Sequence, residues 1–270
     1  MTPTATALPR TTADSLSPDA VAHYRRAGFV HVPGVVAEDR LADLRNAAIE
    51  AAARLKTMAY AKSVFDQCVN AWRDDPAMRE LTLDPNLGAI AEKLAGVPLR
   101  LWHDQILIKQ PGASKATEFH QDQPYWPHAR STHPISCWVA LCDVPVERGC
   151  MTFIGGYQGR DDLAEQDLQS NASMFEVCPE LTWAPRVTVP LRAGDCTFHH
   201  GRTPHMATPN LTDEPRVAHV VIYVDQDTVY TGREHVVTDG LSLEPSAPLE
   251  HELFPAVSTF ADRSTGSPES

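Results

Sequence analysis

The sequence has 270 residues, 43% of them hydrophobic and 21% charged, a composition typical of a globular protein rather than a disordered or fibrous one. The net charge of −12 and the lack of a Lys/Arg cluster argue against nucleic acid and anionic membranes as partners. No apolar run reaches the roughly 18 residues of a membrane helix, and the N-terminus lacks the apolar centre of a signal peptide. We therefore expect a cytoplasmic protein whose six cysteines are reduced, buried thiols.

The first part of the chain, over residues 18–97, is predicted to be mainly helical. Residues 1–17 are rich in Thr, Pro, Ala and Ser, and we expect them to be disordered. Ser17 followed by Pro18 is typical of a helix start, with Ser as the N-cap. The other expectations here are a helix end near Gly28, a strand at 29–34, a helix at 36–55, an ambiguous stretch at 57–72 and one or two helices at 74–95.

From about residue 98 the pattern changes to short apolar strands, which predicts a mainly β core of jelly-roll type over 98–225 with helices outside. A single domain is expected over 18–240, followed by a tail at 241–270. The polar stretch 157–185 is too long for a simple connection and is a candidate lid. Strands are predicted at 101–109, 135–144, 149–154, 186–191, 195–199 and 216–224.

The first candidate metal ligands are His120 and Asp122, which form a His-x-Asp triplet after a strand-like run. On an extended backbone, residues i and i+2 point to the same side, so both side chains could reach one ion. Taken alone this triplet is a weak signal, because a surface loop gives the same three letters by chance.

The segment from 199 to 216 holds the candidates for a third ligand. His205 is our choice, with His199 and His200 as alternatives. A turn separates His205 from Arg216, so the two residues could lie on adjacent antiparallel strands that face one interior. Arg216 opens a largely apolar strand and needs a partner, which is either a ligand carboxylate or a local acid such as Asp213.

Two histidines and one carboxylate suit non-haem Fe(II), because three such ligands leave three coordination positions open. A bidentate 2-oxo acid can occupy two of these positions and O₂ the third. The distant carboxylate of 2-oxoglutarate then needs a cation, and the planar fork of an arginine such as Arg216 is the best side chain for that.

Three motifs, LIKQPGASKATEFHQDQPYW, CWVALCDVPVERGCMTFIGG and GDCTFHH…PH…PN.TDEPR, make the sequence resemble the phytanoyl-CoA dioxygenase family over about residues 18–224. The resemblance implies a double-stranded β-helix (cupin-like) core, iron ligation by His120, Asp122 and His205, and a 2-oxoglutarate contact from Arg216. It also places Lys109, Trp138 and, more weakly, Gln105 in the cosubstrate pocket. The alternative for Lys109 is a solvent-exposed lysine on the surface, and the alternative for Trp138 is an aromatic residue of the core without a role in binding. The family's Gly-Ser-His is replaced here by Gly-Tyr-Gln at 156–158.

This resemblance implies an Fe(II)- and 2-oxoglutarate-dependent dioxygenase that uses O₂ and is stimulated by ascorbate. Because Asp122 is present, we expect hydroxylation of an unactivated C–H bond, with release of succinate and CO₂, rather than halogenation. Desaturation, epimerisation and cyclisation stay open, as does a non-catalytic metal-binding jelly roll. The missing basic cluster favours a free small molecule over a CoA thioester. Tyr125, Trp126 and His103 are candidate substrate contacts, and the protein is expected to be a monomer or homodimer.

Overall fold

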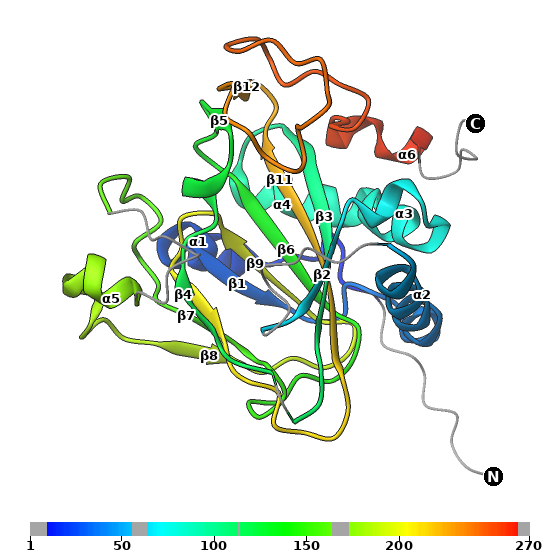
Figure 1. Cartoon of the computed structure of the whole chain (residues 1–270), viewed down its shortest axis with the longest axis vertical. Coiled ribbons are helices and arrows are strands. Elements are labelled where there is room, and N and C mark those ends of the chain that lie inside the picture. The colour runs from blue at the N-terminus through cyan, green and yellow to red at the C-terminus, as the bar shows by residue number, and fades with distance from the viewer. Residues whose placement is uncertain (1–9, 56–63, 113, 164–172, 264–270) are drawn as a thin grey trace.

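The computed structural model describes residues 10–55, 64–112, 114–163 and 173–263 (Figure 1). The helices are α1 (Pro18–Ala27), α2 (Leu41–Arg54), α3 (Pro76–Thr82), α4 (Pro85–Ala95), α5 (Met174–Val177) and α6 (Phe260–Arg263), with 3-10 turns η1 (Glu38–Arg40), η3 (Ala71–Arg73), η4 (Gln123–Tyr125), η5 (Pro179–Leu181) and η6 (Val257–Thr259). The strands are β1 (Phe29–Val32), β2 (Asp66–Val69), β3 (Leu99–Lys109), β4 (Thr117–His120), β5 (His128–Ala129), β6 (Ile135–Ala140), β7 (Met151–Phe153), β8 (Val187–Val189), β9 (Cys196–His200), β10 (His205–Ala207), β11 (Arg216–Asp225) and β12 (Val229–Tyr230).

Two antiparallel sheets form the body of the protein, which confirms the mainly β, jelly-roll prediction. The larger sheet has the order β1-β9-β6-β11-β3-β2, and the smaller one has the order β4-β10-β7-β8. Non-consecutive strands are neighbours in both sheets, as in a double-stranded β-helix. Helices α2, α3 and α4 lie beside the larger sheet in Figure 1, and α2 and α4 contact its strands directly.

The helix starts follow the capping rules of the sequence. The Ser17 side chain accepts a hydrogen bond from the Ala20 backbone N–H, and Pro18 occupies the first turn of α1. Asp75 and Asp84 cap α3 and α4 in the same way. The apolar residues of α4 recur at the spacing of one helix face, and this face is buried in the main core: Leu87, Ile90, Ala91 and Leu94.

The described parts of both terminal segments pack on the domain, which corrects the expectation of disorder for residues 10–17. Residues 10–17 pack on the domain, because Leu16 is buried in the main core and the Arg10 side chain forms an ion pair with Asp84. Residues 1–9 lie outside the described residues. Residues 241–263 of the expected tail are folded against the body of the protein, because Phe254 and Phe260 are buried in the main core.

The described part of the candidate lid, residues 157–163 and 173–185, carries its own apolar contacts. Met174, Cys178 and Leu181 are buried in a second hydrophobic cluster with Phe119 of β4. The described part of the candidate lid therefore packs on the outer side of the smaller sheet. That this segment acts as a lid stays a prediction.

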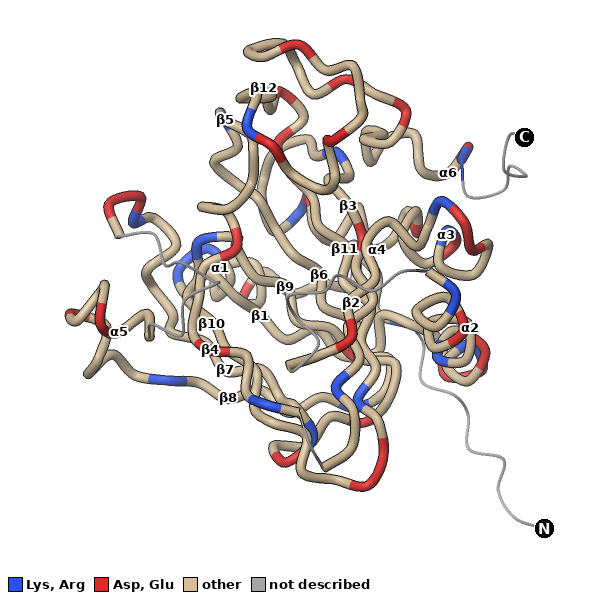
Figure 2. The backbone as a smooth tube through the Cα atoms, viewed as in Figure 1, with Lys and Arg blue, Asp and Glu red and all other residues tan. Residues whose placement is uncertain are grey.

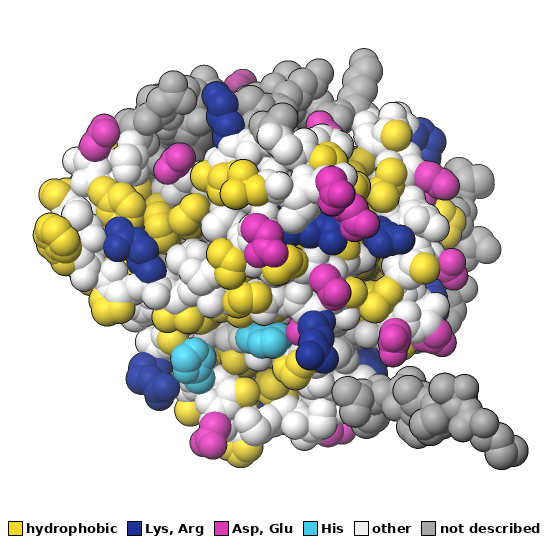
Figure 3. All heavy atoms as spheres, turned by 90° about the horizontal axis from the view of Figure 1, so that it is seen from below, with side chains coloured by type: hydrophobic (Ala, Val, Ile, Leu, Met, Phe, Trp, Pro, Cys, Tyr) yellow, Lys and Arg dark blue, Asp and Glu magenta, His cyan; other side chains and the backbone are white. Residues whose placement is uncertain are grey.

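Charged side chains of both signs are interspersed along the backbone (Figure 2). The face seen in Figure 3 likewise mixes basic, acidic and hydrophobic side chains. Among the described residues, no helix combines the length and the apolar character that crossing a membrane requires. All six cysteines are buried free thiols.

Candidate metal centre and cosubstrate cavity

A cavity of about 530 Å³ opens between the two sheets. On the larger sheet, two rows of residues paired across the strands lie at this cavity. One row is His199, Ser136, Ile222 and His103, and the next is Thr197, Trp138, Val220 and Gln105; all of these except Ser136 and Thr197 line the cavity. Further along, Arg216 pairs with Lys109. Because cross-strand partners point to the same face of a sheet, these rows present their side chains together.

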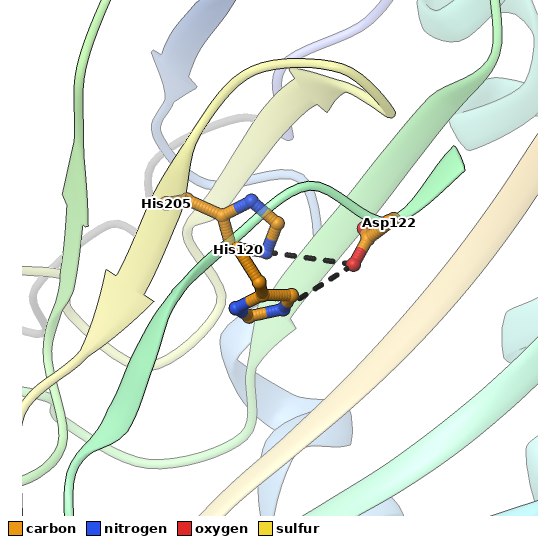
Figure 4. A group of neighbouring side chains, drawn as sticks. All are labelled: His120, Asp122 and His205. Carbon is orange, nitrogen blue, oxygen red and sulfur yellow. Dashed lines mark ion pairs between the residues drawn. The ribbon is translucent and has the colours of Figure 1, made fainter. Parts of the chain in front are cut away.

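His120, Asp122 and His205 meet at this cavity, with their candidate ligand atoms all within 4.8 Å of one another (Figure 4). The Nε2 atoms of His120 and His205 lie 3.4 Å and 3.7 Å from the Asp122 Oδ1 atom. His120 and His205 are cross-strand partners on β4 and β10. One ion placed among these atoms would meet two imidazole nitrogens and one carboxylate oxygen, which is the ligand set of non-haem Fe(II).

The tautomers of both histidines are set for metal binding. Nδ1 of His120 lies 2.7 Å from the Glu118 carbonyl oxygen, and Nδ1 of His205 lies 2.9 Å from the Thr203 carbonyl oxygen. A carbonyl oxygen only accepts, so each Nδ1 must carry a proton, and in the neutral ring each Nε2 has a free lone pair. Backbone support of this kind is what orients the histidines of metal sites.

The electrostatics of the triad keep Asp122 ionised. Burial raises the pKa of Asp122, but the charge of His205 and the hydrogen bonds of its imidazole neighbours outweigh burial and hold the pKa well below its usual range. Burial lowers the pKa of His205 to about 3. Burial also opposes protonation of His120, but the hydrogen bond and charge of Asp122 outweigh it and raise that pKa. A divalent cation that binds to this carboxylate and these imidazoles would displace any proton that the raised pKa keeps on His120.

Asp122 reaches this position through a turn, which corrects our expectation of an extended His-x-Asp backbone. β4 ends at His120, and Asp122 has helical dihedral angles of −81° and −47°. The backbone N–H groups of Asp122 and Gln123 both donate to the Gly201 carbonyl oxygen at 2.9 Å. The loop after β9 therefore fixes the loop after β4.

The second oxygen of Asp122 is held by neighbours on the larger sheet. The Ser136 hydroxyl donates to Oδ2 at 3.3 Å, and Nε2 of His199 lies 3.6 Å from the same atom. His199, one of our alternative ligands, is thus adjacent to the triad but faces the other oxygen. His200, the second alternative, directs Nε2 to the Thr132 carbonyl oxygen at 3.0 Å and does not join the cluster.

Arg216 is a buried cation, only 1% exposed, in the wall of the cavity. It donates to the Leu107 carbonyl oxygen at 3.0 Å, its guanidinium lies 5.2 Å from the Trp138 ring centre, and no described acidic residue forms an ion pair with it. The alternative of pairing with Asp213 is therefore wrong. Burial lowers the pKa of Arg216 to about 10, and its Nε atom has no partner among the described residues. Such a group fits a ligand carboxylate.

Lys109 is fully buried beside Arg216, which rules out the surface-lysine alternative. Its ammonium donates to the Lys115 carbonyl oxygen at 2.6 Å. Burial, and next the charge of Arg216, lower the pKa of Lys109 to about 7. Gly149 allows this arrangement: its φ is +73°, and a Cβ there would lie 3.0 Å from both Arg216 Nε and Lys109 Cδ.

Our prediction that His205 and Arg216 lie on adjacent antiparallel strands is wrong. β10 pairs with β4 and β7 in the smaller sheet, whereas β11 pairs with β3 and β6 in the larger sheet. The turn between them carries the chain across the jelly roll from one sheet to the other. Both residues nevertheless line the same cavity.

The predicted substrate contacts Tyr125, Trp126 and His103 line the cavity, as does Gln105. Gln105 accepts a hydrogen bond from Gln67 of β2 at 2.8 Å. Five further residues of the wall were not identified from the sequence: Val64, Phe65, His235, Val236 and Val237. They belong to a stretch we left ambiguous and to a loop after the last predicted strand, and neither carries a periodic pattern. Ser136 was detectable, because strand alternation puts it on the face of Trp138.

The sequence profile of the phytanoyl-CoA dioxygenase (PhyH) family matches residues 24–218 of the chain. This chain belongs to the phytanoyl-CoA dioxygenase family. A curated relative, phytanoyl-CoA dioxygenase domain-containing protein 1 from Mus musculus, is 27% identical over 154 residues, which cover 54% of this chain and 52% of the relative. The chain thus spans about half the length of the curated relatives it matches.

Two solved structures of this family's fold are more similar. The non-heme alpha ketoglutarate dependent carbocyclase SnoK from nogalamycin biosynthesis is 39% identical with a TM-score of 0.83, covering 92% of this chain and 99% of that one. The epimerase SnoN, solved with Fe3+, alpha ketoglutarate and nogalamycin RO, is 39% identical with a TM-score of 0.80, covering 88% of this chain and 97% of that one. The family membership predicted from the three motifs is confirmed.

Proposed function

We propose that this phytanoyl-CoA dioxygenase family member is an Fe(II)- and 2-oxoglutarate-dependent oxygenase acting on a small organic molecule. The observation that carries the proposal is the single cavity shared by the triad of His120, Asp122 and His205 and by the unpaired buried cation Arg216. Metal ligation alone would not require a buried arginine without an acidic partner, whereas a dicarboxylate cosubstrate does.

Each part of the cavity has a separate task in this proposal. The three ligands would hold iron with their Nε2 atoms and with Asp122 Oδ1, and Ser136 would orient the carboxylate through Oδ2. Arg216 and Lys109 would bind the distant carboxylate of 2-oxoglutarate. Iron and 2-oxoglutarate, when bound, supply O₂ activation, with succinate and CO₂ as by-products. The protein's own contribution is to position the reactants and to exclude water.

The outcome at the substrate is the finer part of the proposal. Asp122 occupies a coordination position that a halide would need, so the site favours oxidation of a C–H bond over halogenation. Hydroxylation is our first candidate. Ring closure or epimerisation is the second, because two structures 39% identical to this chain are named a carbocyclase and an epimerase. The same similarity favours a ring-containing intermediate of secondary metabolism over a CoA thioester.

The test is the turnover of 2-oxoglutarate by the purified chain with Fe(II), O₂ and ascorbate. We expect succinate release that depends on Fe(II) and falls to background in His120→Ala. Mass spectrometry of products from nogalamycin-type substrates then separates the outcomes: hydroxylation adds one oxygen atom, ring closure removes two hydrogen atoms, and epimerisation keeps the mass. A chain that binds neither Mn(II) nor 2-oxoglutarate under anaerobic conditions would instead be a non-catalytic jelly roll.

We also propose a cellular location and an oligomeric state for this protein. Six buried thiols suit a reducing compartment, which supports a cytoplasmic location. A monomer or homodimer is proposed, and sedimentation analysis measures which.

A further inference from the structure

Two histidines outside the metal triad, His103 and His235, line the same cavity. His103 lies on β3, in the row of wall residues closest to Asp122, and is 2% exposed. His235 follows β12 in a turn closed by the Asp239 side chain. The two ring centres are 6.4 Å apart with an angle of 37° between the rings. No hydrogen bond joins the two described rings directly.

The backbone fixes the tautomer of His103. Its Nδ1 atom lies 3.2 Å from the Asp104 carbonyl oxygen. Since that oxygen only accepts, Nδ1 must be the protonated nitrogen of the neutral ring. Nε2 of His103 therefore has a free lone pair, and it has no hydrogen-bond partner among the residues that the structure describes.

The backbone fixes the opposite tautomer in His235. Its Nδ1 atom accepts a hydrogen bond from the Val237 backbone N–H at 3.2 Å. That nitrogen must be unprotonated, so in the neutral ring the proton sits on Nε2. His235 thus offers a free N–H donor where His103 offers a free acceptor.

Both rings are kept neutral by the surrounding protein. Burial lowers the pKa of His103 to about 3, and the nearby His235 adds to this effect. Burial and the charge of Arg233 lower the pKa of His235 to about 4. At neutral pH the pair therefore carries no charge, and the acceptor and donor roles set by the backbone hold.

We infer that His103 and His235 form a subsite for one hydroxyl group of an uncharged substrate. The hydroxyl would donate its proton to His103 Nε2, and its oxygen would accept from His235 Nε2–H. The inference deepens the proposed function and rests on it for the statement that the occupant is the substrate of the oxygenase.

A hydroxyl is the group that satisfies both nitrogens at once. A carboxylate or phosphate oxygen would be repelled by the lone pair of His103, because both atoms are acceptors. An ammonium group would be repelled by the N–H of His235, because both groups are donors. An apolar group would leave two buried polar atoms without partners, which costs binding energy. Two hydrogen bonds of about 2.8 Å to a common oxygen are compatible with the spacing of the two rings.

The surrounding wall indicates what carries the hydroxyl. Trp126, Ile222 and Val237 line the cavity with apolar surface. Flat apolar and aromatic walls favour a ring system, and a few placed polar groups orient it. The substrate class expected at this subsite is therefore a hydroxylated ring compound, alcohol or phenol, with its uncharged hydroxyl facing the histidine pair.

Nitrogen-15 NMR of the histidine-labelled full chain tests the tautomers without any ligand. We expect His103 to be protonated at Nδ1 and His235 at Nε2 at neutral pH. The same tautomer in both rings, or a charged ring in either, would overturn the inference. This measurement uses the unmodified protein, so it does not depend on whether a variant folds.

Calorimetry with 2-naphthol and its methyl ether, 2-methoxynaphthalene, tests the ligand preference. The ether cannot donate to His103, so we expect it to bind about fivefold more weakly than the naphthol. 2-Naphthol should also shift the Nε2 resonances of both histidines. Equal affinities, or no binding of 2-naphthol, would contradict the subsite.

His235→Asn and His235→Gln form a matched pair of variants. Asparagine can still accept from the Val237 N–H but loses the donor at the Nε2 position, so 2-naphthol and its ether should both bind about fivefold more weakly, while the preference between them, which depends on His103, persists. Glutamine can place an amide N–H near that position and should restore both affinities to within about twofold. Equal losses in both variants would assign the effect to the loop and overturn the inference.

Titration of 2-oxoglutarate into the Mn(II)-loaded chain separates this inference from the proposed function. If 2-oxoglutarate binds and the hydroxyl preference is absent, the subsite is wrong and the oxygenase stands. If the preference is present and 2-oxoglutarate does not bind, the proposed function is wrong, and with it the assignment of the occupant as an oxygenase substrate.

Discussion

The two ends of the cavity differ in charge although one strand contributes to both. Lys109 and His103 lie on the same face of β3, six residues and about 20 Å apart along the strand. At the Lys109 end the wall contains the buried cation Arg216, which has no described acidic partner; Lys109 is its cross-strand neighbour and lies just behind the residues that line the cavity. Around His103 the wall is neutral and offers one acceptor and one donor.

The difference shows how one jelly-roll interior can separate two ligands. A buried cation without a counter-ion is costly, and a dicarboxylate relieves that cost by binding there. The neutral end disfavours a second charged ligand and accepts an uncharged one. Between them, the triad lies above the row of wall residues that includes Ser136, so a metal there would be within reach of both ligands.

The largest effect is expected from removing a metal ligand, which would leave the two ends without a common centre. His205→Ala should weaken Mn(II) binding, measured by electron paramagnetic resonance, by at least on the order of a hundredfold, because two ligands hold a divalent ion poorly. His23→Ala, a half-buried histidine of α1 that does not line the cavity, is the matched control and should bind normally. If His205→Ala binds Mn(II) normally while His199→Ala does not, then His199 is the third ligand.

A change at the cationic end should affect the cosubstrate and spare the metal. Arg216→Met should weaken 2-oxoglutarate binding on the order of a hundredfold, because a buried charge-assisted pair is lost, with Mn(II) affinity unchanged. Calorimetry on the Mn(II)-loaded chain measures both constants. Arg40→Met, which removes an exposed cation paired with Glu80, is the control. Unchanged 2-oxoglutarate affinity in Arg216→Met would place the cosubstrate elsewhere.

The smallest effect is a pH dependence at the same end. Because burial lowers the pKa of Lys109 to about 7, the free protein loses this positive charge as pH rises through 7. A bound carboxylate favours the charged form and raises the pKa, so 2-oxoglutarate binding should take up part of a proton at pH 8 and weaken a few-fold from pH 6.5 to 8.5. Calorimetry in buffers of different ionisation enthalpy measures the uptake.

Lys109→Met provides the comparison for that titration. The variant should show no proton uptake and a flatter pH profile over the same range. Proton uptake that persists in Lys109→Met would assign the titration to another group.

The element types were largely predictable, because local patterns decide them. The capping residue Ser17, the apolar stripe from Leu87 to Leu94 and the alternation around Trp138 predicted α1, α4 and β6 from a few neighbouring residues. The short strands β5 and β12 were not predicted, since two residues carry too little periodicity. The packing of residues 10–17 and 241–263 depends on contacts with distant segments, which composition does not report.

The sequence by itself determined the residue types of the site: two histidines, an aspartate and an arginine. It also determined the three motifs in which these residues occur along the chain. Only the tertiary structure decided that His205 and Arg216 come from opposite sheets and still face one cavity. It also decided which Asp122 oxygen faces the histidines and how the backbone sets the tautomers of His103 and His235. The physical reason is that ligand chemistry belongs to single side chains, whereas hydrogen-bond direction and burial arise from segments far apart in sequence that fold together.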